Sequence, residues 1–381
     1  MKFLLIYVPN LRFSYKGDWS KRKLNEICLF FKGNGLSKSD LSNEGFPCIL
    51  YGELYTTYKN EVISDIISKT NTILSNPFLS RNNDLIIPGS GENPIDIAVA
   101  RAIYQNDIIL GGDLNILRPK SNVSAAFLSY QINGVRRYDI AKKAQGKSIV
   151  HLHNSDLKEV LVSIPSYDEQ LHIVKLLTKI DEMIETQSKI INDYKLLKKY
   201  ITKSFIKQKG TSYLLSEIAE LGRGRVISSA EISKQKNPIY PVYSSQTSNN
   251  GVMGYLDNYD YEGEYITWTT DGANAGTVYY RNGKFNCTNV CGILKIKNGY
   301  DAYYVSNILN CYTKKYVSTN LANPKLMNNV MANIKINLPS IERQKYFSNI
   351  LKAIEYRVKI EQDIKLNLVK QKVFLLKNMF L

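Results

Sequence analysis

Apolar residues recur at heptad spacing along one long stretch in the middle of the chain. One column of the heptad grid consists of Ile173, Ile180, Gln187, Tyr194 and Ile201. Two further columns, which begin at Leu176 and Leu177, widen the apolar stripe, and no Gly or Pro interrupts it before Gly210. The pattern predicts a helix of roughly 40 residues with a coiled-coil seam.

The same pattern returns near the end of the sequence. Its first column consists of Phe347, Ile354, Glu361, Leu368 and Leu375. Both stretches open on a similar step, "IPSYDEQ" from Ile164 and "LPSIERQ" from Leu338. Pro precedes each helix, where its missing N–H costs nothing, and acids follow in the first turn, where the helix dipole favours them. We therefore expect a second long helix that repeats the first.

The two predicted helices are expected to pair with each other in antiparallel orientation. Both carry wide apolar stripes, and two similar halves of one chain are naturally related by a pseudo-twofold axis. Gln187 and Glu361 occupy the same layer of the first column. A polar residue at a seam position often fixes the register of a helix pair. The alternative is that each helix packs only against its own domain.

A second repeat precedes the helices. The segment "KLNEICLFF" from Lys23 is similar to "LLSEIAELG" from Leu214. Short β-like runs such as "DLIIPG" and "EYITWTT" are separated by Gly, Asn and Asp, as is typical of strands joined by turns. We predict an α+β protein with two tandem α/β domains, residues 1–164 and 211–338, each followed by a long helix, residues 165–210 and 339–381.

The chain is strongly basic, which suggests a polyanionic partner. Fifty Lys and Arg face 34 Asp and Glu, for a net charge of +16 and a pI near 9.3. A field of this sign favours nucleic acid or an anionic membrane surface. The alternative is that the many Lys codons reflect an AT-rich genome.

Neither export nor membrane insertion is expected. The opening "MKFLLIYVPN" has a short apolar run that Pro9 ends, without a cleavage motif. No apolar stretch approaches the ~18 residues of a membrane span. The cysteines lack a disulfide framework spacing and are expected to be reduced in the cytoplasm; they are Cys28, Cys48, Cys287, Cys291 and Cys311.

Familiar catalytic motifs are missing from the sequence. It contains no G-x-x-x-x-G-K-[ST] loop for ATP, no N-P-P-[YF] or D-P-P-[YF] step of an amino-methylating enzyme, and no Glu-x-Lys step of a metal-dependent nuclease. His151 and His153, or Cys287 and Cys291, supply only two ligands each, which is too few for a zinc site. The sequence therefore favours a binding protein without a metal.

Two segments resemble the specificity subunits of type I restriction-modification enzymes. They are "VPNLRFSYKGDWSKRKLNEI" from Val8, which is similar to the family's opening, and "IPSYDEQLHIVKLLTKID" from Ile164, which is similar to its central conserved region. The resemblance covers essentially the whole chain. The second copy departs from the family pattern, since Arg343 stands where Glu is usual, while Gln344 is kept.

The resemblance implies a non-catalytic DNA-binding subunit. Each globular part would be a target recognition domain that reads one half of a split site in double-stranded DNA, and the helices would be the spacer. Two methyltransferase (M) subunits and two restriction (R) subunits would assemble around the chain. These partners would carry S-adenosylmethionine, ATP and Mg²⁺, and this chain would bind no cofactor. The alternatives are a coiled-coil adaptor without DNA specificity, or a DNA methyltransferase or nuclease with unfamiliar motifs.

Candidate DNA contacts are the basic and polar residues of the predicted loops, because Lys and Arg bind phosphates and Arg, Asn, Gln and small polar groups read bases. In the first domain these are Ser90, Glu92, Asn93, Arg118, Lys120, Arg136, Arg137, Lys142, Lys143 and Lys147. In the second domain they are Ser245, Gln246, Thr247, Asn249, Thr270, Asp271, Asn274, Arg281, Lys314 and Lys315.

Overall fold

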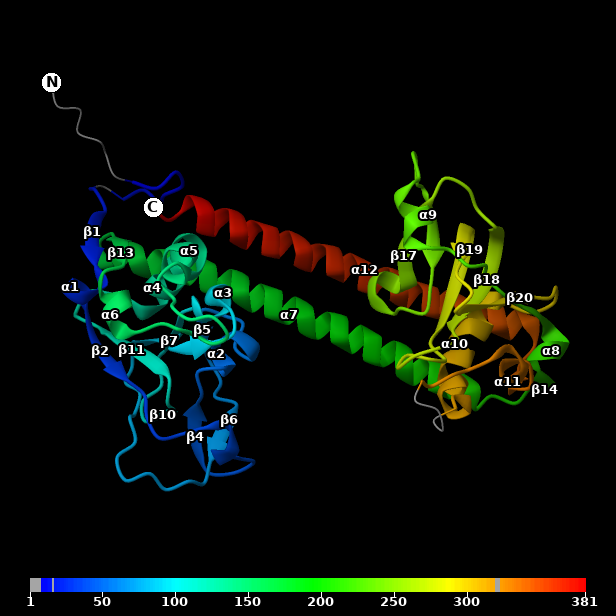
Figure 1. Ribbon diagram of the computed structural model, residues 1–381, viewed down its shortest axis with the longest axis horizontal. Coiled ribbons are helices and arrows are strands. Elements are labelled where there is room, and N and C mark those ends of the chain that lie inside the picture. The colour runs from blue at the N-terminus through cyan, green and yellow to red at the C-terminus, as the bar shows by residue number, and fades with distance from the viewer. Residues whose placement is uncertain (1–7, 16, 319–322) are drawn as a thin grey trace. The chain divides into compact units, whose positions relative to one another are not determined.

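The computed structural model describes residues 8–15, 17–318 and 323–381. The chain divides into two compact units. The N-terminal unit comprises Met1–Ser188 and Asp363–Leu381, and the C-terminal unit comprises Lys189–Gln362. Each unit contains one globular domain and one part of each long helix (Figure 1). Among the described residues, no helix is both long enough and apolar enough to cross a membrane.

The N-terminal domain is built on a five-stranded sheet with the order β2-β11-β7-β9-β5. Both faces of this sheet are buried, as one of its central strands shows. Successive side chains of a strand point to opposite faces of the sheet. In β7 (Asp84–Pro88), Leu85 and Ile87 belong to one core cluster and Ile86 belongs to another. The near-continuous apolar run of this strand follows from that double burial.

A second sheet of the N-terminal domain has the order β10-β4-β6-β3, in which β10 and β4 are parallel. The strands of the domain are β1 (Ser20–Lys23), β2 (Cys28–Lys32), β3 (Leu41–Ser42), β4 (Phe46–Ile49), β5 (Val62–Ile63), β6 (Ser68–Thr70), β7, β8 (Ser90–Gly91), β9 (Arg101–Ile103), β10 (Ile109–Leu110), β11 (Leu114–Pro119), β12 (Val150–His151) and β13 (Leu161–Ile164). The helices are α1 (Leu24–Ile27), α2 (Glu53–Thr56), α3 (Pro94–Ile97), α4 (Ala125–Gln131), α5 (Arg137–Ala141) and α6 (Asn154–Lys158), with a 3-10 turn at Lys38–Asp40 and a π turn at Ile132–Arg136.

The C-terminal domain contains one six-stranded sheet with the order β15-β20-β18-β19-β16-β17. Helix α10 packs against β18 and β19, and Trp268, Leu294 and Tyr304 are fully buried in the core. The strands are β14 (Thr211–Leu214), β15 (Ala219–Arg223), β16 (Tyr240–Tyr243), β17 (Val252–Leu256), β18 (Tyr261–Thr269), β19 (Val278–Cys287), β20 (Cys291–Ile296) and β21 (Lys335–Leu338). The helices are α8 (Leu215–Ile218), α9 (Ser229–Ser233), α10 (Ala302–Tyr312) and α11 (Asn328–Ala332), with 3-10 turns at Ser248–Gly251 and Thr313–Tyr316.

The two domains begin with the same three elements. A four-residue strand, a four-residue helix and a five-residue strand follow one another as β1-α1-β2 and again as β14-α8-β15. The first strand of each set pairs antiparallel with the last strand of its domain, β13 or β21. The internal repeat predicted from the sequence is therefore present in the fold.

The two long helices are α7 (Tyr167–Ile206), with 40 residues, and α12 (Ile341–Asn378), with 38. In the N-terminal unit the start of α7 packs against the end of α12, where Lys372 Nζ lies 2.5 Å from Asp181 Oδ1. In the C-terminal unit the end of α7 packs against the start of α12, where the rings of Phe205 and Phe347 stack with centroids 3.7 Å apart. The predicted antiparallel pairing is confirmed, and the alternative of two unpaired helices is wrong.

Burial along the helices defines which columns form the seam. In the first column Ile173, Ile180, Gln187, Phe347, Ile354, Glu361 and Leu368 are buried, whereas Tyr194, Ile201 and Leu375 are half-buried. The third column, with Leu177 and Leu351, is buried as well. In the second column, Met183 and Leu197 are exposed, whereas Leu176, Ile190 and Ile350 are half-buried. The first and third columns lie four residues apart and share one helix face, and the second column lies at the edge of that face.

Candidate nucleic-acid interface

A repeated glutamine joins each domain to its long helix. Gln170 Oε1 accepts a hydrogen bond from Ser124 N at 2.9 Å, and Gln170 Nε2 donates to Pro165 O at 3.1 Å. Ser124 is the N-cap of α4. The side chain is fully buried. This glutamine therefore satisfies backbone groups of both the domain and the helix entry.

Gln344 makes the same two bonds in the C-terminal unit. Its Oε1 accepts from Asp301 N at 3.0 Å, and its Nε2 donates to Pro339 O at 2.8 Å. Asp301 is the N-cap of α10. The sequence repeat contained the signal for this contact, since Gln is one of the few polar residues that both copies keep. Both globular domains are thus positioned on the helices by the same pair of hydrogen bonds.

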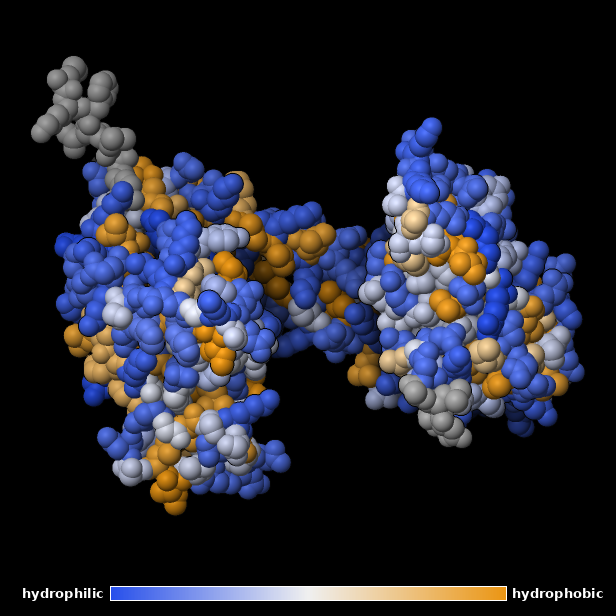
Figure 2. Space-filling view, in the orientation of Figure 1, coloured by the Kyte–Doolittle hydropathy of each residue, from blue (hydrophilic) through white to orange (hydrophobic). Residues whose placement is uncertain are grey.

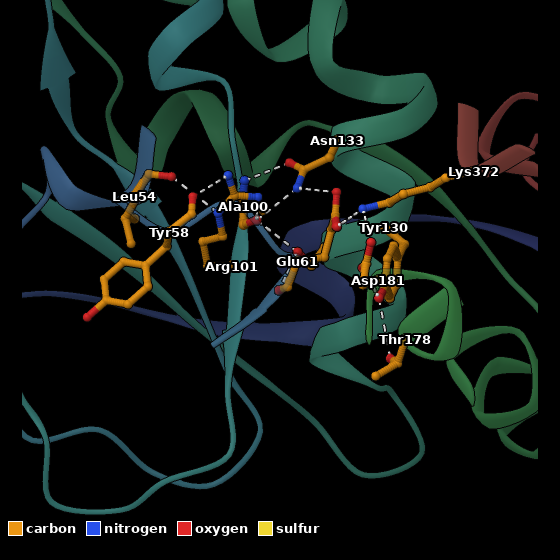
Figure 3. A network of polar contacts seen from close by, with 11 residues as sticks. Leu54, Tyr58, Glu61, Ala100, Arg101, Tyr130, Asn133, Thr178, Asp181 and Lys372 are labelled. Carbon is orange, nitrogen blue, oxygen red and sulfur yellow. Dashed lines mark hydrogen bonds and ion pairs between the residues drawn. The ribbon is translucent and has the colours of Figure 1, made fainter. Parts of the chain in front are cut away.

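A buried ionic cluster fixes the N-terminal domain to both long helices (Figure 3). Lys372 Nζ of α12 lies 2.6 Å from Glu61 Oε2 and 2.5 Å from Asp181 Oδ1 of α7. Tyr130 OH of α4 donates to Asp181 Oδ2 at 2.7 Å. Burial raises the pKa of the Asp181 carboxyl, although the Lys372 ammonium opposes this shift. The Lys372 ammonium therefore pairs with two carboxylates, those of Glu61 and Asp181, from different parts of the fold.

The hydrogen-bond network continues from this cluster toward α2. Asn133 Nδ2 and Oδ1 pair with Ala100 O at 3.0 Å and Ala100 N at 2.8 Å. The buried guanidinium of Arg101 donates to Leu54 O at 3.2 Å and to Tyr58 O at 3.0 Å (Figure 3). Burial lowers the pKa of Arg101. These bonds hold the segment that contains α2 in place.

In the C-terminal domain, two loops that the sequence predicts to contact DNA line one hollow. We name it the C-terminal hollow. Ser245 and Gln246 lie on one side, and Asp271 and Asn274 lie on another. Asn274 Nδ2 donates to Thr247 Oγ1 at 3.1 Å and so connects the two loops. The hollow has a volume of about 480 Å³ and is lined by Ile227, Ser244, Ser245, Gln246, Met253, Asp271, Gly272, Ala273, Asn274, Thr288, Asn289 and Val290.

Arg281, which was also predicted as a DNA contact, is not part of the lining of the hollow. Arg281 is buried, and its guanidinium carbon lies 3.5 Å from the centroid of the Tyr243 ring. Its Nη2 donates to Asn250 O at 2.9 Å, next to the exposed Asn249. Burial lowers the pKa of Arg281. Its role in the structure is therefore to order this loop.

Thr270 and Lys314 also bond within the C-terminal domain. Thr270 is buried, and its Oγ1 donates to Asp271 Oδ2 at 2.6 Å or to Val290 O at 2.8 Å. Lys314 Nζ donates to Ala275 O at 2.9 Å, and both Lys314 and Lys315 are exposed. Of the residues predicted as DNA contacts, the hollow thus gathers Ser245, Gln246, Asp271 and Asn274.

The residues predicted as DNA contacts in the N-terminal domain do not line a common surface. Ser90 is buried in β8 and donates to Asp113 Oδ2 at 3.0 Å, and Asn93 caps α3. Arg118 forms two bonds of 2.8 Å to Asp84. Internal carbonyls accept from the remaining anchored cations: Glu26 O from Lys120, Leu381 O from Arg136 and Ile95 O from Arg137. Glu92, Lys142 and Lys147 are exposed, and Lys143 is half-buried.

Neither of the two ligand pairs noted in the sequence is extended into a metal site. The rings of His151 and His153 stack with centroids 6.1 Å apart. Cys287 Sγ and Cys291 Sγ lie 3.6 Å apart, both buried. Within residues 8–15, 17–318 and 323–381, no group of three or more His, Cys, Asp or Glu side chains is arranged to hold a metal ion.

The family model of the type I restriction modification DNA specificity domain matches residues 16–195 and again residues 210–371. The chain belongs to this family. The two matches coincide with the two copies of the repeat, each with its domain and its long helix. The double match is thus the sequence counterpart of the repeated β1-α1-β2 and β14-α8-β15 elements.

Relatives of this specificity family agree with the assignment. A Mycoplasma pneumoniae protein, described as the N-terminus of a candidate type I specificity subunit, is 44% identical over 37% of this chain and 75% of its own length. The specificity subunit of the type I restriction enzyme MpnII, from the same organism, is 42% identical over 38% of this chain and 43% of its own length. The crystal structure of an M. genitalium type I restriction-modification S subunit covers 98% of this chain and 99% of that chain, with a TM-score of 0.66 and 17% identity, which supports the fold.

The residues that carry the specificity-family resemblance act as anchors in this structure. Arg12 Nε and Nη2 each donate to the Glu169 carboxylate at 2.7 Å, and Trp19 Nε1 donates to it at 3.2 Å. The equivalent Arg343 instead donates to Gln208 Oε1 at 3.1 Å. In the C-terminal unit the chain runs from α7 (ending at Ile206) directly into β14 (from Thr211), whereas the Arg12 segment precedes β1 in the N-terminal unit.

Proposed function

We propose that this chain is the sequence-specific DNA-binding subunit of a type I restriction-modification complex. It recognises a bipartite site in double-stranded DNA and scaffolds two M subunits and the R subunits in the cytoplasm. It is a non-catalytic component, and S-adenosylmethionine, ATP and Mg²⁺ are bound by the partners. The net charge of +16 suits a protein that neutralises DNA phosphates.

The observation that supports this proposal best is the repetition of the whole assembly of domain and helix. Gln170 and Gln344 make the same pair of bonds in the two units. A single chain with two equivalent surfaces can hold two identical partners and can present two recognition domains. Such a repeat is suited to a DNA site with two parts and to a stoichiometry of two M subunits for one copy of this chain.

The solvent faces of the long helices are suited to partner subunits. On the molecular surface that faces the viewer in Figure 2, most residues of both units are hydrophilic, with apolar patches among them. Exposed apolar side chains are frequent on α7 and α12, and large exposed patches mark interaction sites. On these helices they are Tyr167, Leu171, Met183, Leu196, Leu197, Tyr200, Tyr346, Tyr356, Ile364, Leu366, Val369, Val373 and Phe374.

Domain replacement in the reconstituted complex tests the proposal. The chain is expressed with its M subunits, and residues 211–338 are replaced by the matching domain of a relative. Sequencing of methylated bases should show one half-site changed and the other retained, since each domain is held by its own contacts. A change in both half-sites would contradict independent reading.

Two controls separate the alternatives. DNA affinity that is uniform across sequences would support a coiled-coil adaptor without specificity. Methyl transfer from labelled S-adenosylmethionine, or plasmid cleavage, by the purified chain alone would support an enzyme with unfamiliar motifs.

A further inference from the structure

The N-terminal domain has a hollow of about 620 Å³ whose lining was not selected from the sequence. We name it the N-terminal hollow. Three separate segments form its walls: the turn before and into the 3-10 helix, the loop from β4 into α2, and the turn before β11. The lining residues are Leu36, Ser37, Lys38, Leu41, Leu50, Tyr51, Gly52, Glu53, Thr56, Thr57, Gly112 and Asp113.

One wall is the counterpart of a wall of the C-terminal hollow. Strand β4 pairs in parallel with β10, as β16 pairs in parallel with the end of β19. Gly111 N donates to Ile49 O at 2.9 Å, and Thr288 N donates to Tyr243 O at 2.8 Å. The residues that follow these strands, 50–52 in one domain and 244–246 in the other, line the two hollows.

A required glycine places the other two walls in the same way. A Cβ on Gly33 would lie 2.1 Å from Gly111 O, and a Cβ on Gly224 would lie 2.0 Å from Cys287 O. Only glycine permits the chain to pass so close to the turn that precedes β11 or β20. That close approach brings Leu36 and Ile227 to the same position in the respective hollows.

The remaining wall differs between the domains. In the C-terminal hollow it is formed by residues 271–274, which follow β18. In the N-terminal hollow it is formed by α2, whose Glu53 Oε2 accepts from Leu50 N at 2.7 Å. Ser90 of β8, which follows β7, is not part of the lining and donates to Asp113 Oδ2. The two hollows thus share their place in the fold and differ in their chemistry, as readers of two different sequences would.

We propose that the N-terminal hollow reads base edges of the N-terminal half-site, with Lys38, Tyr51 and Asp113 as the specificity-determining residues. This inference rests on the proposed function. Lys38 and Asp113 are exposed and Tyr51 is half-buried at the rim. A lysine donates to the acceptors of guanine, a carboxylate accepts from the amino group of cytosine, and a tyrosine hydroxyl can do either.

The test uses the complex of the full chain with its M subunits, after the wild-type half-sites are known from methylated-base sequencing. Lys38→Ala, Tyr51→Phe and Asp113→Asn are compared with Lys69→Ala, an exposed lysine on β6 outside the hollow. Binding is measured by competition with duplexes that carry one changed base pair each. We expect at least one hollow variant to lose roughly tenfold discrimination at one position of the N-terminal half-site only.

Matched variants in the C-terminal hollow complete the test. Gln246→Ala and Asn274→Ala should relax discrimination in the C-terminal half-site alone. If all three N-terminal variants bind DNA and keep full discrimination in the N-terminal half-site, the inference is wrong while the proposed function stands. If the wild-type complex binds every duplex equally, the proposed function itself fails. Thermal melting of each variant excludes misfolding, and Asp113→Asn preserves the size of the side chain.

Discussion

The amide oxygen of Gln170 accepts a hydrogen bond from the backbone N–H of Ser124, which begins the helix α4 of the N-terminal recognition domain. Gln344 and Asp301 stand in the same relationship in the C-terminal unit. Each of these glutamines joins the first turn of a domain helix to the start of a long helix.

Replacement of either glutamine is expected to destabilise its own unit. Gln170→Ala or Gln344→Ala leaves a buried backbone N–H and a carbonyl without their side-chain partner, which costs about 1–3 kcal/mol each. Chemical denaturation monitored by circular dichroism measures the loss. Gln362→Ala, at an exposed position of α12, is the matched control and should change stability by less than about 0.5 kcal/mol. Equal effects in all three variants would contradict the structural role.

Lys372 is expected to be important for the stability of the N-terminal unit. Lys372→Met leaves Glu61 and Asp181 buried without their shared cation, and removal of one partner of a buried ion pair costs about 3–5 kcal/mol. The exposed Lys370→Met is the control. Hydrogen exchange should show the loss in α4 and in the adjoining part of α7. A variant as stable as the wild type would mean that the two carboxylates are satisfied without the lysine.

Asp181 should give the stability of the chain a specific pH dependence. Its pKa in the folded protein is raised above its ordinary value of 3.8, chiefly by burial. The folded state therefore binds more protons than the unfolded state between the two pKa values, and this contribution is lost as pH rises through the folded value. The difference in unfolding free energy between wild type and Asp181→Asn should decline from about pH 3.8 upward. A difference that instead grows with pH would indicate that Lys372 outweighs burial.

The positive charge of the chain predicts a steep dependence of DNA binding on salt. The association constant should fall by about 0.9 log unit per log unit of salt for each phosphate neutralised. Lys142 and Lys147 are exposed. If both contact phosphates, the double alanine variant should reduce the slope by about two and weaken binding to all sequences alike. Fluorescence anisotropy at several salt concentrations measures this slope, and a wild-type slope near zero would refute the electrostatic contribution.

If the long helices are the spacer, their length sets the gap between the half-sites. Insertion of one heptad into both helices, near Gln187 and Glu361, keeps the apolar stripe in phase. Each helix gains about 10.5 Å, which corresponds to roughly three base pairs of B-DNA. Methylated-base sequencing should show unchanged half-sites and a gap longer by up to about three base pairs. An active complex with an unchanged gap would assign the spacing to another part of the chain.

The long helices could be predicted because their signal is local and periodic. The heptad columns through Ile173 and Phe347 repeat over many turns, and Pro and acidic residues mark both starts. The exposure of Met183 and Leu197 in the second column could not be predicted from the pattern, and the reason is physical. A heptad pattern shows that two or three columns are apolar, but the crossing of the two helices decides which pair of columns meets.

The walls of the N-terminal hollow could not be predicted in the same way. Leu36, Tyr51 and Asp113 are brought together by the parallel pairing of β4 with β10, a contact between distant segments that leaves no periodic signal. Burial of cations is equally hard to predict from the sequence. Arg118 and Arg281 look like DNA contacts by residue type, yet a salt bridge to Asp84 holds one and a stack on Tyr243 holds the other.

The order of the two units along the chain has a consequence for the gene. The C-terminal unit is one uninterrupted segment, Lys189–Gln362, whereas the N-terminal unit is closed by the separate segment Asp363–Leu381. A recombination event that exchanges the coding sequence for residues 189–362 therefore transfers one complete recognition domain together with its own parts of both helices. Exchange of the other recognition domain with its helix parts requires two separate coding segments, one on each side of that for residues 189–362. If only one of these two segments is exchanged, Lys372 from one parent must form its ion pairs with Glu61 and Asp181 from the other parent.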